Sequence, residues 1–127
     1  MIAGIDHLVL TVRSKDETCA FYARVLGFRR IDAPGRPTAL AFADQKINVH
    51  EAGHTFEPKA LAPTAGAGDF CLVCRWPMAK LRAHLEREKV DVELGPVVRD
   101  GARGKMTSVY FRDPDGNLVE VSCYDRF

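Results

Sequence analysis

The feature that most constrains this chain is an internal repeat of one pattern, a strand, a helix and three strands. The segment Ala41-Phe42-Ala43-Asp44, before the last turn of the first half, matches Tyr110-Phe111-Arg112-Asp113 in the second. A repeat constrains architecture more than any single strand assignment does. The sequence therefore predicts an α+β fold, a single domain over residues 1–127 made of two βαβββ modules, 1–50 and 68–127, joined by linker 51–67. We expect the modules to curl around a shared cavity.

Periodicity places the elements within each module, because strands alternate with period two and helices with period 3.6. A capping box from Ser14 to Glu17 starts the first helix, which should end near Leu26 before Gly27. The second helix is expected at 78–89. A glycine-rich loop through residues 95–104 should precede the last two strands. The strands are expected at 4–12, 28–33, 38–43, 46–50, 69–74, 92–94, 106–111 and 118–123.

Composition excludes several function classes. The chain has 18 Lys and Arg residues against 17 Asp and Glu residues, interspersed along its length, so it lacks the clustered basic face of a nucleic-acid-binding protein. No apolar run approaches the roughly 20 residues of a membrane span, and the chain opens without a secretory signal pattern. We expect a cytoplasmic protein whose partner is a small molecule.

Strand parity divides the side chains between the two faces of each sheet. In the first, fourth and last strands, alternate Leu, Ile and Val residues form the set that faces the helix. The opposite face then carries His7 from the first strand, Asn48 and His50 from the fourth, Asp69 from the fifth and Glu120 from the last. We expect these polar side chains to face the cavity.

Two imidazoles and one carboxylate suit a divalent metal ion in an open site. His7, His50 and Glu120 are the predicted ligands, and Zn, Fe, Mn or Ni would fit such a set while leaving positions for substrate or water. A lone histidine in a strand is more often a hydrogen-bonded residue than a ligand. His50 therefore competes with Asp69, which would be a fourth ligand or a carboxylate that orients a ligating histidine.

Three further side chains are predicted to bind substrate. Asn48 lies on the polar face of the fourth strand. Arg103 and Lys105 lie in the glycine-rich loop, where they would meet an anionic group of the substrate. The alternative for both basic residues is that they solvate a turn.

At these positions the chain resembles the vicinal-oxygen-chelate superfamily of glyoxalases, bleomycin-resistance proteins and extradiol dioxygenases. The resemblance covers essentially the whole chain, and within it segments 44–51 and 56–60 look closest to the subgroup of glyoxalase domain-containing protein 5 and virulence-type glyoxalase-like proteins. The segments that carry the superfamily resemblance are Ile5-Asp6-His7-Leu-Val-Leu-Thr-Val12, Phe21-Tyr22, Val25-Leu-Gly-Phe28 and Tyr110-Phe-Arg-Asp-Pro-Asp-Gly-Asn-Leu-Val-Glu120-Val.

The resemblance implies metal ligands on the first and last strands, which match His7 and Glu120, and others on the fourth and fifth. Glyoxalase I has a carboxylate on the fourth strand and a histidine on the fifth, whereas this chain has His50 and Asp69. Specific activities of the family therefore do not carry over. The resemblance also implies a homodimer.

Together these features predict a metal-dependent, glyoxalase-like lyase or isomerase. It would act on a small oxygenated metabolite through metal-stabilised enediolate-type chemistry, with Glu120 as the catalytic group that moves a proton. One alternative is an extradiol-type ring-cleaving dioxygenase, which needs oxidisable iron. Another is a non-catalytic protein that binds a small metabolite or drug, as a resistance protein does.

Overall fold

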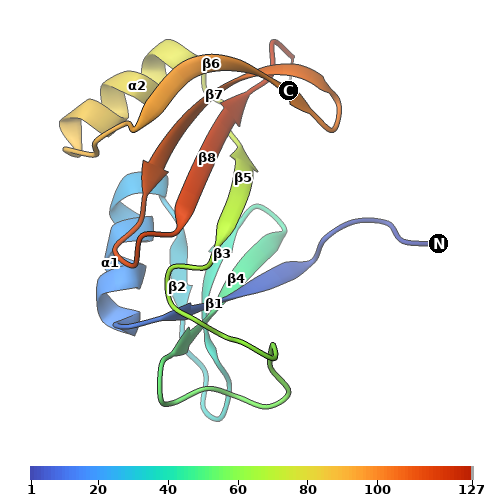
Figure 1. Cartoon of the computed structure of the whole chain (residues 1–127), viewed down its shortest axis with the longest axis vertical. Coiled ribbons are helices and arrows are strands. Elements are labelled where there is room, and N and C mark those ends of the chain that lie inside the picture. The colour runs from blue at the N-terminus through green and yellow to red at the C-terminus, as the bar shows by residue number, and fades with distance from the viewer. Residues whose placement is uncertain (127) are drawn as a thin grey trace. The chain divides into compact units, whose positions relative to one another are not determined.

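The computed structural model describes residues 1–126 and divides into two compact units, each built on one four-stranded sheet (Figure 1). The first unit comprises Met1–Ala67 and Pro114–Gly116, and the second comprises Gly68–Asp113 and the chain from Asn117 onward. The predicted α+β fold with a duplicated βαβββ order is confirmed. None of the helices in residues 1–126 is long and apolar enough to span a membrane.

In the first unit the sheet has the strand order β1-β4-β3-β2. β1 and β4 run parallel, and the other neighbouring pairs are antiparallel. The helix packs against β2, β3 and β4. The elements are β1 (His7–Val12), α1 (Lys15–Leu26), β2 (Arg29–Ile31), β3 (Thr38–Phe42) and β4 (Gln45–Glu51).

The ends of α1 are where the sequence predicts them. Ser14 is the N-cap, and its Oγ accepts a hydrogen bond of 3.2 Å from the backbone N–H of Glu17. Gly27 ends the helix with φ 71°, a left-handed conformation that glycine adopts without steric cost. Between these caps Tyr22 and Val25 are buried, so local signals and packing agree on this element.

The second unit repeats the topology with the strand order β5-β8-β7-β6. Again the first and last strands are parallel neighbours and the other pairs are antiparallel. Its elements are β5 (Asp69–Val73), α2 (Met78–Arg87), β6 (Leu94–Gly101), β7 (Gly104–Arg112) and β8 (Leu118–Cys123). The helix buries Leu81 and Leu85.

The predicted glycine-rich loop is wrong, because β6 and β7 form a long hairpin that turns at residues 102–103. Gly101 and Gly104 are paired residues at its end. Gly95 lies where the ladder shifts register, and a Cβ there would stand 2.4 Å from the carbonyl oxygen of Ser108. Gly95 therefore permits close approach between the two strands. Of the short strand expected at 92–94, only Leu94 lies in β6, which continues to Gly101.

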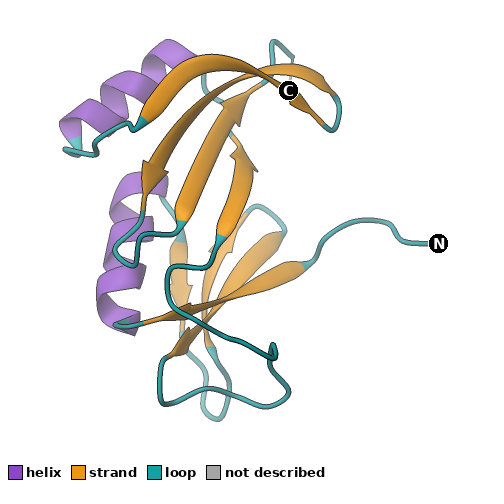
Figure 2. Cartoon of the chain, viewed as in Figure 1, coloured by secondary structure: helices purple, strands orange, loops and turns teal. Residues whose placement is uncertain are grey.

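The predicted linker is 51–67. Glu51 is the last residue of β4, and the rest of the segment is a loop apart from one bridge between Glu51 and His54 (Figure 2). It belongs to the first unit, as does the turn Pro114–Gly116. Within that unit, Asp115 Oδ1 accepts hydrogen bonds from the backbone N–H of Arg13 at 3.0 Å and from its Nε at 2.8 Å. A Cβ on Gly66 would stand 2.7 Å from the Asp115 carbonyl oxygen.

Candidate functional site

The sheet of the first unit has one apolar and one polar face, as strand parity predicts. Leu10 and Val12 of β1 and Ile47 and Val49 of β4 are buried. The intervening residues project from the opposite face. There β1 carries the exposed His7, and β4 carries Asn48, which is half-buried, and His50, which is 5% exposed.

The register of β1 and β4 separates the two histidines. His7 pairs with Lys46, whereas His50 pairs with Thr11, four positions further along the strands. Four residues of a parallel strand span about 13 Å. The expectation that His7 and His50 bind one ion is therefore not supported by the register. Asn48 lies two positions nearer to His7 than His50 does.

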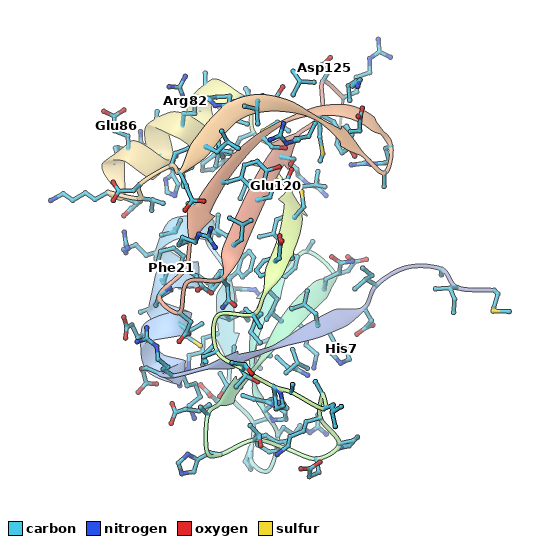
Figure 3. All side chains as sticks on the ribbon, in the orientation of Figure 1. His7, Phe21, Arg82, Glu86, Glu120 and Asp125 are labelled. Carbon is cyan, nitrogen blue, oxygen red and sulfur yellow. The ribbon has the colours of Figure 1, made fainter. Side chains whose placement is uncertain are left out.

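His7 lies on β1 with its side chain partly exposed (Figure 3). Its Nδ1 is 2.7 Å from Oδ1 of Asp6. A carboxylate at Nδ1 fixes the ring tautomer with the proton on Nδ1, which leaves the lone pair on Nε2. This is how histidines that bind a metal are usually oriented.

His50 lies in a different environment, under the loop that follows β4. Its ring centroid is 5.5 Å from that of Phe56, and no described residue forms a hydrogen bond with its Nδ1. Burial lowers the pKa of His50, and the nearby charge of Lys59 lowers the pKa further. The imidazole is therefore neutral at pH 7, with one N–H donor and one acceptor nitrogen.

In the second unit Glu120 projects from β8 (Figure 3). Two serine hydroxyls orient its carboxylate. Its Oε2 accepts hydrogen bonds from Ser108 Oγ at 2.7 Å and from Ser122 Oγ at 3.2 Å. The two hydroxyls are themselves 2.6 Å apart. Ser108 was missed at the sequence level, although alternation along β7 places it on this face and could have identified it.

Asp69 and Cys71 are neighbours of Glu120 on β5. Cys71 pairs with Glu120 and Asp69 with Leu118, so both side chains share the face of Glu120. Cys71 Sγ is 3.1 Å from Ser122 Oγ, and burial raises the pKa of its thiol. Asp69 and Glu120 are the two carboxylates on this face.

The basic residues predicted to bind substrate have partners in the β6–β7 hairpin. Arg103 lies over the ring of Tyr124, with its guanidinium carbon 4.5 Å from the ring centroid. Lys105 forms an ion pair with Asp100. Another cation, Arg99, donates from Nε to the Tyr110 hydroxyl at 3.0 Å.

A metal site needs several donor side chains that converge on one point. Among residues 1–126, no group of three or more His, Cys, Asp or Glu side chains is arranged to hold an ion. Two donors nevertheless fit a ligand role by their surroundings. His7 is hydrogen-bonded to a carboxylate and Glu120 to two hydroxyls, and metal ligands are usually oriented by such bonds.

Comparison with known proteins covers nearly the whole chain. The sequence model described as the Glyoxalase/Bleomycin resistance protein/Dioxygenase superfamily matches residues 4–121. Virulence protein STM3117 of Salmonella typhimurium is 44% identical over 124 residues, which span 98% of this chain and 86% of that protein. Its crystal structure matches with a TM-score of 0.95 and 98% coverage of both chains.

Two other relatives are named as a glyoxalase-domain protein and as a lyase. Glyoxalase domain-containing protein RDO1 of Mycosarcoma maydis is 44% identical over 123 residues, 97% of this chain and 69% of that protein. The crystal structure of lactoylglutathione lyase from Agrobacterium tumefaciens is 25% identical with a TM-score of 0.73. It covers 96% of this chain and 94% of that one.

Proposed function

Because this chain belongs to the Glyoxalase/Bleomycin resistance protein/Dioxygenase superfamily, we propose that it is a metal-dependent, glyoxalase-like lyase or isomerase that acts on a small oxygenated metabolite. The observation that carries the proposal is the environment of Glu120, a carboxylate oriented by Ser108 and Ser122 on the polar face of its sheet. The likeness to a lactoylglutathione lyase supports the same reaction class.

His7 and Glu120 are the proposed ligands of one divalent ion. Bound there, the metal would supply Lewis-acid chemistry by polarising a carbonyl or hydroxyl oxygen of the substrate. Asp69, on the face of Glu120, is the proposed third donor. His50 is assigned to the substrate instead, because four register positions separate it from His7.

Glu120 is also the proposed catalytic group, in the role of a proton acceptor. The two serine hydroxyls both bind Oε2, so they hold the carboxylate in one orientation. A fixed carboxylate can take a proton from a carbon or hydroxyl group of a substrate that lies within hydrogen-bond distance. The serines thereby act as positioning residues for this oxygen.

We further propose that the protein works as a homodimer. Val9 on β1 and Val73 on β5 are 46% and 44% exposed, and each shares its sheet face with proposed site residues. Apolar side chains beside a polar site are commonly covered by a partner or a ligand. Sedimentation analysis of the purified chain would test the dimer directly, and a monomer at all concentrations would contradict it.

The metal proposal is tested by replacing each ligand and measuring Zn²⁺ content after reconstitution. Wild type should bind about one ion per chain, and His7→Ala and Glu120→Ala should each weaken affinity by roughly 100-fold or more. His84→Ala and Glu86→Ala, on α2, are matched controls that should bind as wild type does. Full zinc occupancy in either ligand variant would show that the assignment is wrong.

Activity is tested separately on α-hydroxycarbonyl compounds and hemithioacetals, with the reconstituted wild-type protein. Isomerisation or lyase turnover that disappears in Glu120→Ala would support the proposed reaction. Dioxygen consumption with catechol, in iron-loaded protein only, would instead indicate the ring-cleaving alternative.

A second candidate function is non-catalytic binding of a small molecule. It is favoured by His50, whose buried imidazole nitrogen has no partner among the described residues and would bind a ligand without any ion. Ligand affinity that is unchanged by EDTA, together with no turnover under any metal, would support this function over the enzymatic one.

A further inference from the structure

Two buried side-chain atoms on the polar face of β4 are unpaired, unlike the other buried polar side-chain atoms of residues 1–126. Asn48 Oδ1 and His50 Nδ1 are buried and have no hydrogen-bond partner there. The large majority of buried side-chain polar atoms are paired, so an unpaired one needs a specific explanation. Two of them, two residues apart on one strand, project from the same face.

From this placement we infer that Asn48 and His50 form a hydrogen-bonding subsite for the hydroxyl or amide group of an uncharged small molecule with an apolar body. The subsite lies within the first unit. It does not depend on the proposed metal or on Glu120, so it can fail or succeed independently of the proposed reaction.

The chemistry of the two atoms selects the ligand group. An amide oxygen accepts hydrogen bonds only, so Asn48 Oδ1 needs a donor from the ligand. A neutral imidazole offers one donor and one acceptor, and a hydroxyl can pair with either. A hydroxyl or amide therefore satisfies both residues, whereas an ionised carboxylate brings acceptors only.

Three apolar side chains lie beside the pair, with Thr11 as the polar neighbour of His50 in the register, and they favour an apolar body for the ligand. In the sheet register Asn48 lies between Val9 of β1 and Ala39 of β3. The ring of Phe56 lies against His50. An aromatic or aliphatic group next to the hydroxyl would bury apolar surface against these three side chains.

Two lysines bear on whether an anion would bind instead. Lys59 is already paired, since its Nζ is 3.1 Å from Glu57 Oε1 and 3.0 Å from Thr55 Oγ1. Lys46 lies two residues before Asn48 on the same face. Its charge would favour binding of a carboxylate ligand, so the test includes a carboxylate.

The inference is tested by NMR titration of the metal-free full chain with benzyl alcohol and with benzoate, which share a ring and differ in charge. Benzyl alcohol should shift the Asn48 side-chain amide and the backbone amides of residues 47–51. Benzoate should bind about tenfold more weakly or not at all. Benzoate binding as tightly as the alcohol, or no shift with benzyl alcohol, would overturn the inference.

Two variants and one control assign the effect to the pair. Asn48→Leu and His50→Phe should each weaken benzyl alcohol binding by about tenfold. His54→Phe, the same change at an exposed position four residues further on, should bind as wild type. The spectra also report folding, and retained affinity in both folded variants would show that the pair is not the binding site.

Discussion

Asn48 on β4 and Asn117, directly before β8, are the same residue type in matching regions of the two units, and they differ in how their amides are used. Asn117 is 1% exposed, and its Oδ1 accepts from the backbone N–H of Gly68 at 2.7 Å while its Nδ2 donates to Asp113 at 2.8 Å. Asn48 Oδ1 has no partner among the described residues. One amide holds its own unit together, and the other is available to a ligand.

The largest expected effect comes from making the same substitution at both asparagines. Asn117→Leu removes the side-chain bonds to the Gly68 N–H and to Asp113 Oδ2, which should lower the free energy of unfolding by about 3 kcal/mol. Asn48→Leu removes an amide oxygen that makes no bond, so the change should lie within about 1 kcal/mol of wild type or stabilise.

Urea denaturation of the metal-free variants measures both changes under the same conditions. An equal loss of unfolding free energy in Asn48→Leu and Asn117→Leu would contradict the difference between the two asparagines, because it would show that Asn48 also has a structural role. If Asn48→Leu gains stability and loses ligand binding, the difference between the two asparagines is larger than expected, because Asn48 would then lower stability in favour of function.

The next effect compares the two serine hydroxyls that donate hydrogen bonds to Glu120. Ser108→Ala removes the shorter bond, 2.7 Å, and should lower the free energy of unfolding by about 1 kcal/mol. Ser122→Ala removes the longer bond of 3.2 Å to Glu120 and also the contacts of its Oγ with Ser108 at 2.6 Å and with Cys71 at 3.1 Å, so it should cost at least as much. If the serines position a metal ligand, Ser108→Ala should also weaken Zn²⁺ affinity by roughly tenfold.

Zinc affinity separates positioning from a purely structural role, because a serine that only fills space would change stability and leave affinity unchanged. Ser108→Thr keeps a hydroxyl and serves as the conservative variant that should restore affinity. Identical zinc binding in Ser108→Ala and wild type would contradict the positioning role.

The fold was predictable from sequence wherever its signals are local. Both caps of α1 are specified by residues next to the helix, Ser14 and Gly27, and each lies where expected. β6 was missed because Gly95 and Gly101 look like loop residues in sequence. Their requirement comes from the Ser108 carbonyl on the facing strand β7 and from the Tyr124 hydroxyl just after β8, which both lie further along the chain.

For the candidate site, the sequence predicted which face of the sheet each side chain lies on, but not how far apart the side chains lie along the strands. Alternation along a strand correctly placed His7, Asn48 and His50 on the polar face of their sheet. It could not fix how far β1 slides past β4, because that register depends on pairing between segments that lie far apart in the chain. The offset of His7 and His50 is therefore a property that only the structure provides.

The smallest expected effect concerns the pH dependence of stability in the first unit. Burial, then the charge of Lys59, lowers the folded-state pKa of His50, so the unfolded state binds its proton more readily than the folded state does. Stability from the neutral imidazole is complete above the ordinary pKa near 6.5 and is lost as pH falls through the folded-state pKa.

This effect is measured as the difference in unfolding free energy between pH 7 and pH 5 in wild type and in His50→Phe. The variant should lose less stability on acidification, because it has no proton to bind at this position. His54→Phe, at an exposed histidine, should follow wild type. Benzyl alcohol should increase the acid sensitivity of wild type, since it would bind the neutral imidazole. Equal pH dependence of wild type and His50→Phe would show that His50 is not held neutral by the fold, and the contrast between the two units would then depend on Asn48 alone.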